Sequence, residues 1–288
     1  MPQRYISNEL SHFVGKDKTE EEQYQLLVNK ILKPGLLTYP PHDPSKPRMA
    51  NLDLSQPIST DDLIQYQAVC FCDIPISDFA IHIQKYSKFG LAFKKEFLIQ
   101  KGACPVFYIA NESHVTVNEV FNPDNFSERI NAALKKGYLD RALYFDTSIR
   151  AIIDIFVALD ALSRNENDQY FKGVNASEFK NRFGTLLGLT PNQISLIEST
   201  LKNNIQAPKT IKMCTDFLLN YVFTFIKCFD ANRSFEDKSN YYMEREWRIG
   251  DNVQFTLEDV SRVFFPSSYA QKFRADLPSY VGQINFID

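Results

Sequence analysis

The first zone of the chain, residues 1–123, combines one helical pattern with several short apolar runs. Apolar residues recur at helical spacing across residues 20–32, and Pro34 with Gly35 ends that pattern. The run QAVCFCDIP predicts a buried strand that stops at Pro75. The segments KFGLAFKKEF and CPVFYIAN predict two more strands, or a strand, a short helix and a strand. This zone is therefore expected to supply much of a strand-rich core.

The pattern changes to a helical period in the middle zone, residues 124–239. The segment SIRAIIDIFVALDALSR is apolar on nearly all sides, which is typical of a central buried helix. Further helices are expected at NFSERINAALKKG, at TPNQISLIESTLKN and across residues 217–229. The last zone, residues 240–288, returns to short strand-like runs. This order predicts an α+β fold, in which the first and last zones form one sheet and the middle zone is a helical insertion.

Charge and composition narrow the classes of function. The 288 residues include 32 Lys and Arg against 35 Asp and Glu, a formal net charge of −3, which disfavours a general nucleic-acid coat. The longest apolar stretch, residues 217–229, is shorter than the roughly 20 residues that a membrane span needs. The initial segment MPQRYISNELSHFVG lacks the apolar run of a signal peptide. Five irregularly spaced cysteines favour a reducing compartment, so we expect a cytoplasmic protein.

The most informative segment is MEREWRIG, residues 243–250. As a strand, it places Glu244, Glu246 and Arg248 on one face, because successive side chains alternate. One interpretation is an exposed strand face crossed by salt bridges. The other is a carboxylate that Arg248 holds inside a pocket, where the carboxylate stabilises positive charge that develops on a sugar.

A metal site is disfavoured, and the cysteines and histidines give little sign of catalysis. Cys70 and Cys72 share one face of the predicted strand, but the chain has no CxxC pair, and free cysteine is commonly buried. We expect both thiols to be reduced and buried without metal. The four histidines are scattered along the chain. His12 lies among polar residues and is the candidate catalytic histidine.

Lysines and aromatic residues alternate near the predicted central strand. Cations interleaved with rings can contact RNA or a nucleotide phosphate, and the same pattern is typical of a solvated helix end. The ten glycines form no GxGxxG or GK[ST] motif, which disfavours Rossmann and P-loop sites. The residues of this basic set are Lys85, Tyr86, Lys88, Phe89, Lys94 and Lys95.

Several long segments resemble the AbiGi family of abortive-infection, phage-resistance proteins. The resemblance lies in RYISNELSHFVG, in ILKPGLL, in the run from VCFCDIP to PVFYIAN, and in EREWRIG. It covers most of the first zone and the final strand region. It implies a role in phage defence, as an antitoxin beside a nucleotidyltransferase-like toxin.

The order of some segments is also similar to ADP-ribosyltransferases of the DarT type. These segments are an early helix followed by Gly-Leu, a central FGLAF segment, and a late Glu followed by an aromatic residue. In that family the late Glu contacts the nicotinamide ribose of NAD, and the matching residue here is Glu246. The family's histidine and threonine pair has no clear counterpart, and His12 and Arg4 match it only loosely. The resemblance implies an ADP-ribosyltransferase-like fold with NAD as its substrate.

Two hypotheses follow from these observations. The first is an NAD-consuming effector without a metal. The second is a non-enzymatic antitoxin or regulator that neutralises a partner toxin or defence protein through protein or nucleic-acid contacts. The candidate catalytic residues are Glu246, Glu244 and His12, and the candidate residues for binding NAD or another nucleotide are Arg248, Tyr86, Phe89 and Arg4.

Overall fold

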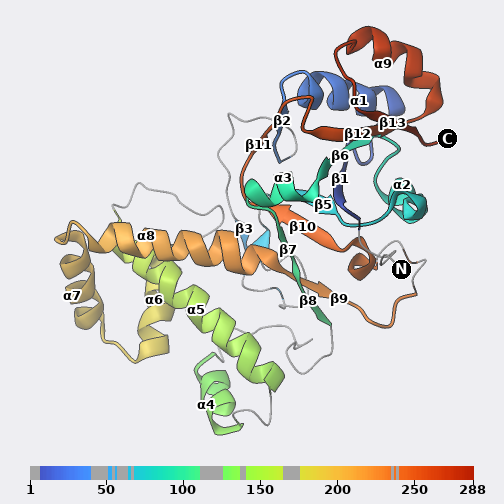
Figure 1. Cartoon of the computed structure of the whole chain (residues 1–288). Helices are drawn as coiled ribbons and strands as arrows, with labels where there is room; N and C mark the ends of the chain where they lie inside the picture. Colours follow the sequence, from blue (N-terminus) through green and yellow to red (C-terminus); the bar gives the residue numbers. More distant parts are fainter. Residues whose placement is uncertain are drawn as a thin grey trace. The chain divides into compact units, whose positions relative to one another are not determined.

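The computed structural model describes residues 7–39, 51–53, 56, 64–65, 68–110, 126–136, 141–164, 176–234, 237 and 240–288. The chain divides into two compact units, which Figure 1 shows coloured along the sequence. Unit 1 comprises Met1–Pro47, Gln67–Val106 and Asn232–Asp288, and unit 2 comprises Arg48–Tyr66 and Phe107–Ala231. The helical insertion expected from the sequence has different limits, residues 124 and 239.

Unit 1 is built on a seven-stranded mixed sheet with the order β13-β12-β6-β1-β5-β10-β7. Strands β12 and β13 are parallel, and the other neighbours are antiparallel. The strand from EREWRIG lies beside the strand from VCFCDIP, which confirms that the first and last zones share one sheet. The strands are β1 (Glu9–Phe13), β5 (Val69–Cys72), β6 (Gly90–Lys94), β7 (Cys104–Pro105), β10 (Glu246–Ile249), β12 (Val260–Phe265) and β13 (Gln283–Phe286).

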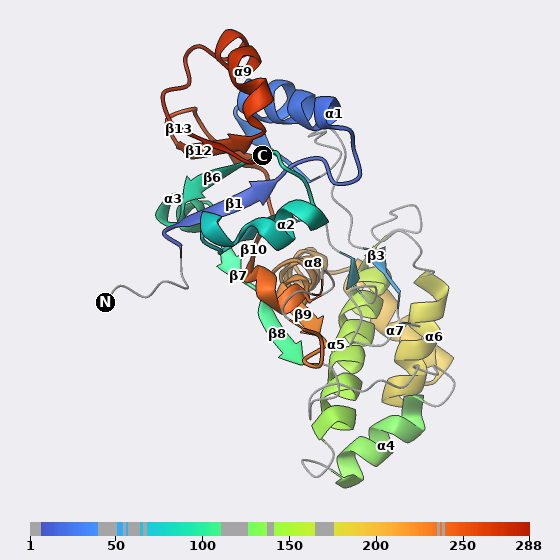
Figure 2. The same cartoon turned by 90° about the vertical axis from the view of Figure 1, so that its right-hand side faces the viewer.

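Helices cover both faces of this sheet, so the α+β prediction is confirmed. On one face, α1 (Glu20–Gln25), α3 (Lys95–Gln100) and α9 (Ala270–Asp276) contribute to the main hydrophobic core. Figures 1 and 2 show α1 and α9 side by side, and the Tyr24 hydroxyl of α1 donates to Asp276 of α9 at 2.7 Å. On the other face, α2 (Ala80–Lys85) and the turn before it cover a smaller aromatic cluster. The sheet is thus the middle layer of unit 1.

The first helix begins where the sequence predicts it. Thr19 caps the helix, and its side chain and that of Glu22 form reciprocal hydrogen bonds with each other's backbone N–H. After Gln25 the helix continues as a π-helix over Leu26–Leu32. Gly35, at φ +63°, follows the helix. A small two-stranded sheet then joins β2 (Leu36–Leu37) to β11 (Val253–Gln254).

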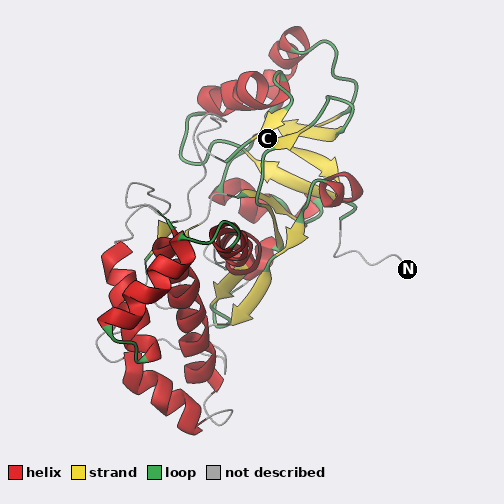
Figure 3. Cartoon of the chain, turned by 90° about the vertical axis from the view of Figure 1, so that its left-hand side faces the viewer, coloured by secondary structure: helices red, strands yellow, loops and turns green. Residues whose placement is uncertain are grey.

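Unit 2 is mainly helical, as the red ribbons of Figure 3 show. The long α5 packs against α4, α6, α7 and α8, and its apolar residues form the centre of the unit's own core. Within the described residues, no helix is long and apolar enough to cross a membrane. The helices are α4 (Phe126–Lys136), α5 (Arg141–Ser163), α6 (Ala176–Leu187), α7 (Pro191–Lys202) and α8 (Ala207–Phe217).

One helix prediction in unit 2 is partly wrong. The helical run that starts in α8 ends near Val222, and Ile226–Phe229 form the strand β9. Strand β9 pairs in parallel with β8 (Phe107–Ala110), so long-range pairing overrides the local apolar pattern. A second short pair joins β3 (Asn51–Leu52) to β4 (Ile64–Gln65).

Candidate functional site

A line of polar and thiol side chains crosses the centre of the sheet in unit 1. Ser11 on β1 pairs with Cys72 on β5, and Cys72 pairs with Glu246 on β10. Directly paired residues of neighbouring strands point to the same face, so these three side chains lie on the face that α2 covers. Arg248 follows two residues after Glu246 and shares that face.

Glu246 and Arg248 form a forked ion pair. Arg248 Nε donates to Glu246 Oε1 at 2.7 Å, and Arg248 Nη2 donates to Oε2 at 3.3 Å. Glu246 is only 4% exposed, so bulk water screens this pair little. A two-point contact fixes both groups and compensates the carboxylate's charge. The sequence placed these two residues on one strand face, and the structure shows them there.

Glu244 reaches the same region from a turn. It ends the 3₁₀ turn Tyr241–Glu244, and Arg245 then adopts a left-handed backbone conformation with φ 46° and ψ 54°. Strand β10 begins only at Glu246. The left-handed residue breaks the alternation of a strand, so the prediction that Glu244 belongs to the strand face is wrong.

The end of α2 binds Glu244. Tyr86 Oη donates to Glu244 Oε1 at 2.6 Å, and Lys85 forms an ion pair with the same oxygen. Burial raises the pKa of Tyr86, and the nearby charges of Glu244 and Glu246 raise it further. The Tyr86 hydroxyl therefore stays protonated as a donor. We call Lys85, Tyr86, Glu244, Glu246 and Arg248 the carboxylate cluster.

A buried histidine, His82, lies among aromatic rings next to this cluster. His82 is 4% exposed, and its ring stacks on Phe13 at 6.0 Å and lies 6.3 Å from the ring of Tyr86. Neither ring nitrogen of His82 has a hydrogen-bond partner within the described part of the chain. Burial lowers the pKa of His82; the Glu244 charge opposes this shift, and the Lys85 charge adds to it. His82 is therefore held as a neutral imidazole.

This burial predicts a pH-dependent stability. A histidine whose pKa is lower in the folded state binds more protons when unfolded, so the free energy of unfolding should fall as the pH drops below the ordinary histidine pKa of 6.5. The decrease should continue down to the lower pKa of the folded state. His82→Leu, which has similar volume and no titration, should flatten this part of the curve in urea unfolding between pH 7.5 and pH 5. An unchanged slope in that variant would contradict the assignment.

His12 lies on the other face of the sheet. It neighbours Ser11, which shares a sheet face with Cys72 and Glu246, so strand alternation turns His12 away from them. Its Nδ1 lies 2.8 Å from the Cys70 carbonyl oxygen, and its ring lies 5.8 Å from that of Phe71. The structure therefore does not bring this candidate catalytic histidine to the carboxylate cluster.

The two candidate residues still to be placed are Phe89 and Arg4. Phe89 is fully buried in the main core, with ring contacts to Tyr24 and Tyr269 at 6.4 and 5.1 Å. It has the environment of a core residue and lies outside the carboxylate cluster. Arg4 lies outside the described residues.

A second charged centre, around Asp73, was missed by the sequence analysis. Asp73 is 4% exposed and accepts from Lys95 Nζ at 2.9 Å and from the Ser7 backbone N–H at 3.1 Å. Arg245 Nη2 lies 3.5 Å from the same carboxylate, and Lys95 lies over the Trp247 ring at 5.4 Å. The available signal was an acidic residue directly after a buried strand. Its partners come from three other segments, which sequence spacing does not reveal.

A pocket of about 820 Å³ lies beside this second centre. A 2.6 Å ion pair between Arg262 and Glu9 forms part of its wall. The basic set predicted from the sequence is divided among different places: Lys85 pairs with Glu244, Lys88 lies 3.7 Å from Glu20, and the other two lysines line this pocket. The lining residues are Ser7, Asn8, Glu9, Lys94, Lys95, Glu96, Ile99 and Arg262.

The cysteine expectation is partly wrong. Cys72 is buried, and burial raises the pKa of its thiol, with the Glu244 charge adding to the effect. Cys70, which was expected to be buried, is exposed. Both are free thiols. Among the described residues, no group of three or more His, Cys, Asp or Glu could hold a metal ion.

Fold and site together define a mixed α+β protein with a buried ion-pair network on one face of its sheet. The chain belongs to the AbiGi family, whose model matches residues 64–277 and carries the description "Putative abortive phage resistance protein AbiGi, antitoxin". This match confirms the family resemblance, and the family implies a role in phage defence of the antitoxin type. No curated protein and no solved structure matches the chain.

Proposed function

We propose that this chain is the antitoxin of an abortive phage resistance system and neutralises its partner toxin by binding it, without an enzymatic step. The observation that carries the proposal is the state of the two carboxylates. Glu246 is compensated by the Arg248 guanidinium, and Glu244 by Lys85 and the Tyr86 hydroxyl. A catalytic carboxylate has to direct its charge at the substrate. Here the charge of each carboxylate is directed at side chains of the protein itself.

The separation of the predicted catalytic residues supports the same proposal. His12 faces away from Glu246 across the sheet, and Phe89 packs in the main core. The carboxylate cluster then has a structural role, since it joins β10 and its preceding turn to the end of α2. Buried ion pairs of this kind can fix one arrangement of a fold, which suits a protein that presents a surface to a partner.

A matched pair of assays tests the proposal. A nucleotidyltransferase-like protein from the same genome, the class of toxin that the family resemblance implies, is expressed in a bacterial host with wild type or with Glu246→Gln, while growth and the NAD level are recorded. Glu246→Gln keeps size and hydrogen bonding but removes the charge. Because loss of one member of the buried pair lowers stability, growth is scored at a temperature where melting curves show both forms to be folded. There we expect both forms to restore growth and neither to lower NAD when expressed alone. Loss of rescue by the folded variant would contradict the non-enzymatic proposal.

The alternative is an NAD-consuming ADP-ribosyltransferase-like activity. Its support is the place of Glu246: a carboxylate that is 4% exposed, in line with Ser11 and Cys72 and close to Tyr86. A desolvated carboxylate at a fixed position can stabilise a sugar carbon that becomes cation-like as nicotinamide leaves. In that case, wild type alone should deplete NAD, and Glu246→Gln should reduce the rate by about 10²–10³.

A further inference from the structure

Helix α8 of unit 2 carries an exposed stripe of large side chains. Lys209, Met213, Phe217 and Tyr221 recur at every fourth residue, as α8 continues into the π-helix Leu218–Val222, so they follow one side of the helix. Met213, Phe217 and Tyr221 are 64%, 57% and 60% exposed. The rings of Phe217 and Tyr221 stack at 6.1 Å with an angle of 22° between their planes. We call these four residues the α8 stripe.

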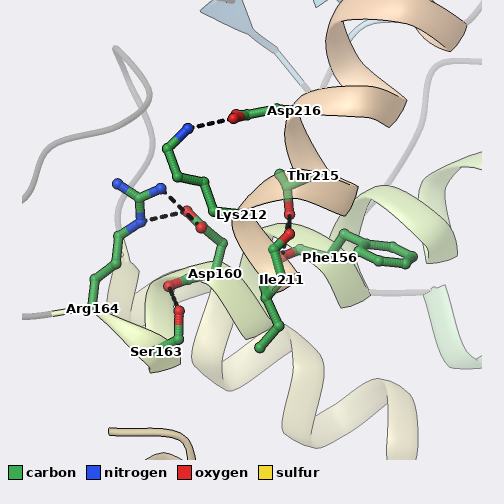
Figure 4. Close-up of polar contacts among 8 residues, drawn as sticks. All are labelled: Phe156, Asp160, Ser163, Arg164, Ile211, Lys212, Thr215 and Asp216. Atoms are coloured by element: carbon green, nitrogen blue, oxygen red, sulfur yellow. Dashed lines mark hydrogen bonds and ion pairs between the residues drawn. The ribbon is translucent and has the colours of Figure 1, made fainter. Parts of the chain in front are cut away.

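The opposite side of α8 is fastened to α5, as Figure 4 shows. Thr215 Oγ1 donates to the Phe156 carbonyl of α5 at 3.4 Å and to the Ile211 carbonyl of its own helix at 2.9 Å. Leu219, one turn further, is buried in the core of unit 2. The helix is therefore held by one side and presents the stripe from the other. A surface that is already ordered loses little conformational freedom when it binds.

The composition of the stripe is that of a protein-binding surface. Met and aromatic residues are enriched in the buried centres of interfaces, and Tyr is common among residues that dominate binding energy. Single exposed apolar residues need no explanation, but three in a line on one helix are the pattern of a helix that enters a hydrophobic groove. The i, i+4 spacing, which separates Met213 from Phe217 and Phe217 from Tyr221, is one of the spacings that such anchors use.

The charges beside the stripe indicate which charge the rim of a complementary groove should carry. The two acidic residues of α7 and α8 form ion pairs: Glu198 with Lys180 and Lys202, and Asp216 with Lys212. Lys209, at the N-terminal end of the stripe, is exposed and has no ion pair among the described residues. The surface thus offers a positive charge followed by three apolar side chains. Its complement is an apolar groove with a carboxylate at one end.

We propose that the α8 stripe docks into such a groove on the partner toxin. The proposal rests on the proposed antitoxin function and adds the binding surface to it. Met213, Phe217 and Tyr221 fill the groove, and Lys209 pairs with a carboxylate at its rim. The stripe belongs to unit 2, whereas the carboxylate cluster belongs to unit 1.

Affinity measurements with the full chain and the same purified nucleotidyltransferase-like protein test this docking surface. Phe217→Asp should weaken the Kd by about 30-fold or more, because it places a charge at the centre of an apolar contact. Leu134→Asp is the matched control, since Leu134 on α4 is 69% exposed in the same unit. It should bind like wild type. Melting temperatures close to wild type for both variants show that the fold is intact.

Charge reversal separates the rim contact from the apolar contacts. Lys209→Glu should slow association by roughly 10-fold at low salt, and the difference should shrink as salt screens the charge. Lys135→Glu, an exposed lysine on α4, provides the charge-matched control and should leave the association rate near wild type. An equal effect of both reversals would overturn the proposed rim contact.

The outcomes distinguish this proposal from the function on which it rests. If wild type neither binds the toxin nor restores growth, the antitoxin function fails. If wild type does both and Phe217→Asp matches it, the function stands and the docking surface is overturned. If Phe217→Asp instead dissolves a dimer of this chain and leaves the toxin Kd unchanged, the stripe binds a second copy, which also overturns the proposal.

Discussion

Replacing Arg248 with Met should lower the free energy of unfolding by about 3–5 kcal/mol, the cost typical of a buried ion pair that loses one member. The substitution keeps the length of the side chain but removes both N–H donors from Glu246, which is 4% exposed. A carboxylate in that environment protonates more readily, so the deficit should shrink at acidic pH. Urea unfolding at pH 7.5 and pH 4.5 measures both effects.

Two matched variants separate the ion pair from the general loss of an arginine. The double variant Glu246→Gln with Arg248→Met should recover much of the stability, since it removes both charges. Lys88→Met breaks an exposed pair with Glu20, whose side chains are 41% and 51% exposed, and should cost less than about 1 kcal/mol. If Arg248→Met cost no more than Lys88→Met, the pair would have no structural role.

The sequence could predict which site residues share a strand face, because side chains alternate along a strand. It put Glu246 and Arg248 on one face, and the register with Cys72 and Ser11 confirms that placement. The same rule failed for Glu244, because Arg245 adopts a left-handed conformation that few residues other than glycine favour. A single residue of this kind ends the alternation, and no local pattern announces it.

Partners distant in the sequence could not be predicted. Lys85 and Tyr86 bind Glu244 from positions 159 and 158 residues away, and which strand face a residue occupies depends on register with other strands. His12 shows this: its polar neighbours suggested a site, but Ser11 is the residue that shares a sheet face with Glu246. The fold class was easier, because runs of strands and helices can be recognised from local periodicity.

The link between core and site can be tested at Phe264, where we expect the second large effect. This side chain is fully buried, and its ring lies 5.1 Å from Phe13 and 5.2 Å from Phe79, beneath α2. Gly90 lies directly against it: a Cβ there would come within 2.3 Å of the Phe264 ring. Phe264→Ala should leave a cavity and lower the free energy of unfolding by about 3–5 kcal/mol.

Because Phe264 supports α2, its loss should also loosen the carboxylate cluster. Lys85 and Tyr86 reach Glu244 from the end of α2. In Phe264→Ala, hydrogen exchange should therefore accelerate more at residues 80–86 than at the residues of the sheet. Phe286→Ala, which truncates a phenylalanine that is 52% exposed on β13, should change neither quantity much. Unaltered exchange at residues 80–86 would mean that the ion pairs, rather than the aromatic layer, hold α2 on the sheet. If Phe264→Ala lowers stability but leaves exchange at residues 80–86 unchanged, the ion pair and hydrogen bond to Glu244 alone hold Lys85 and Tyr86 in place.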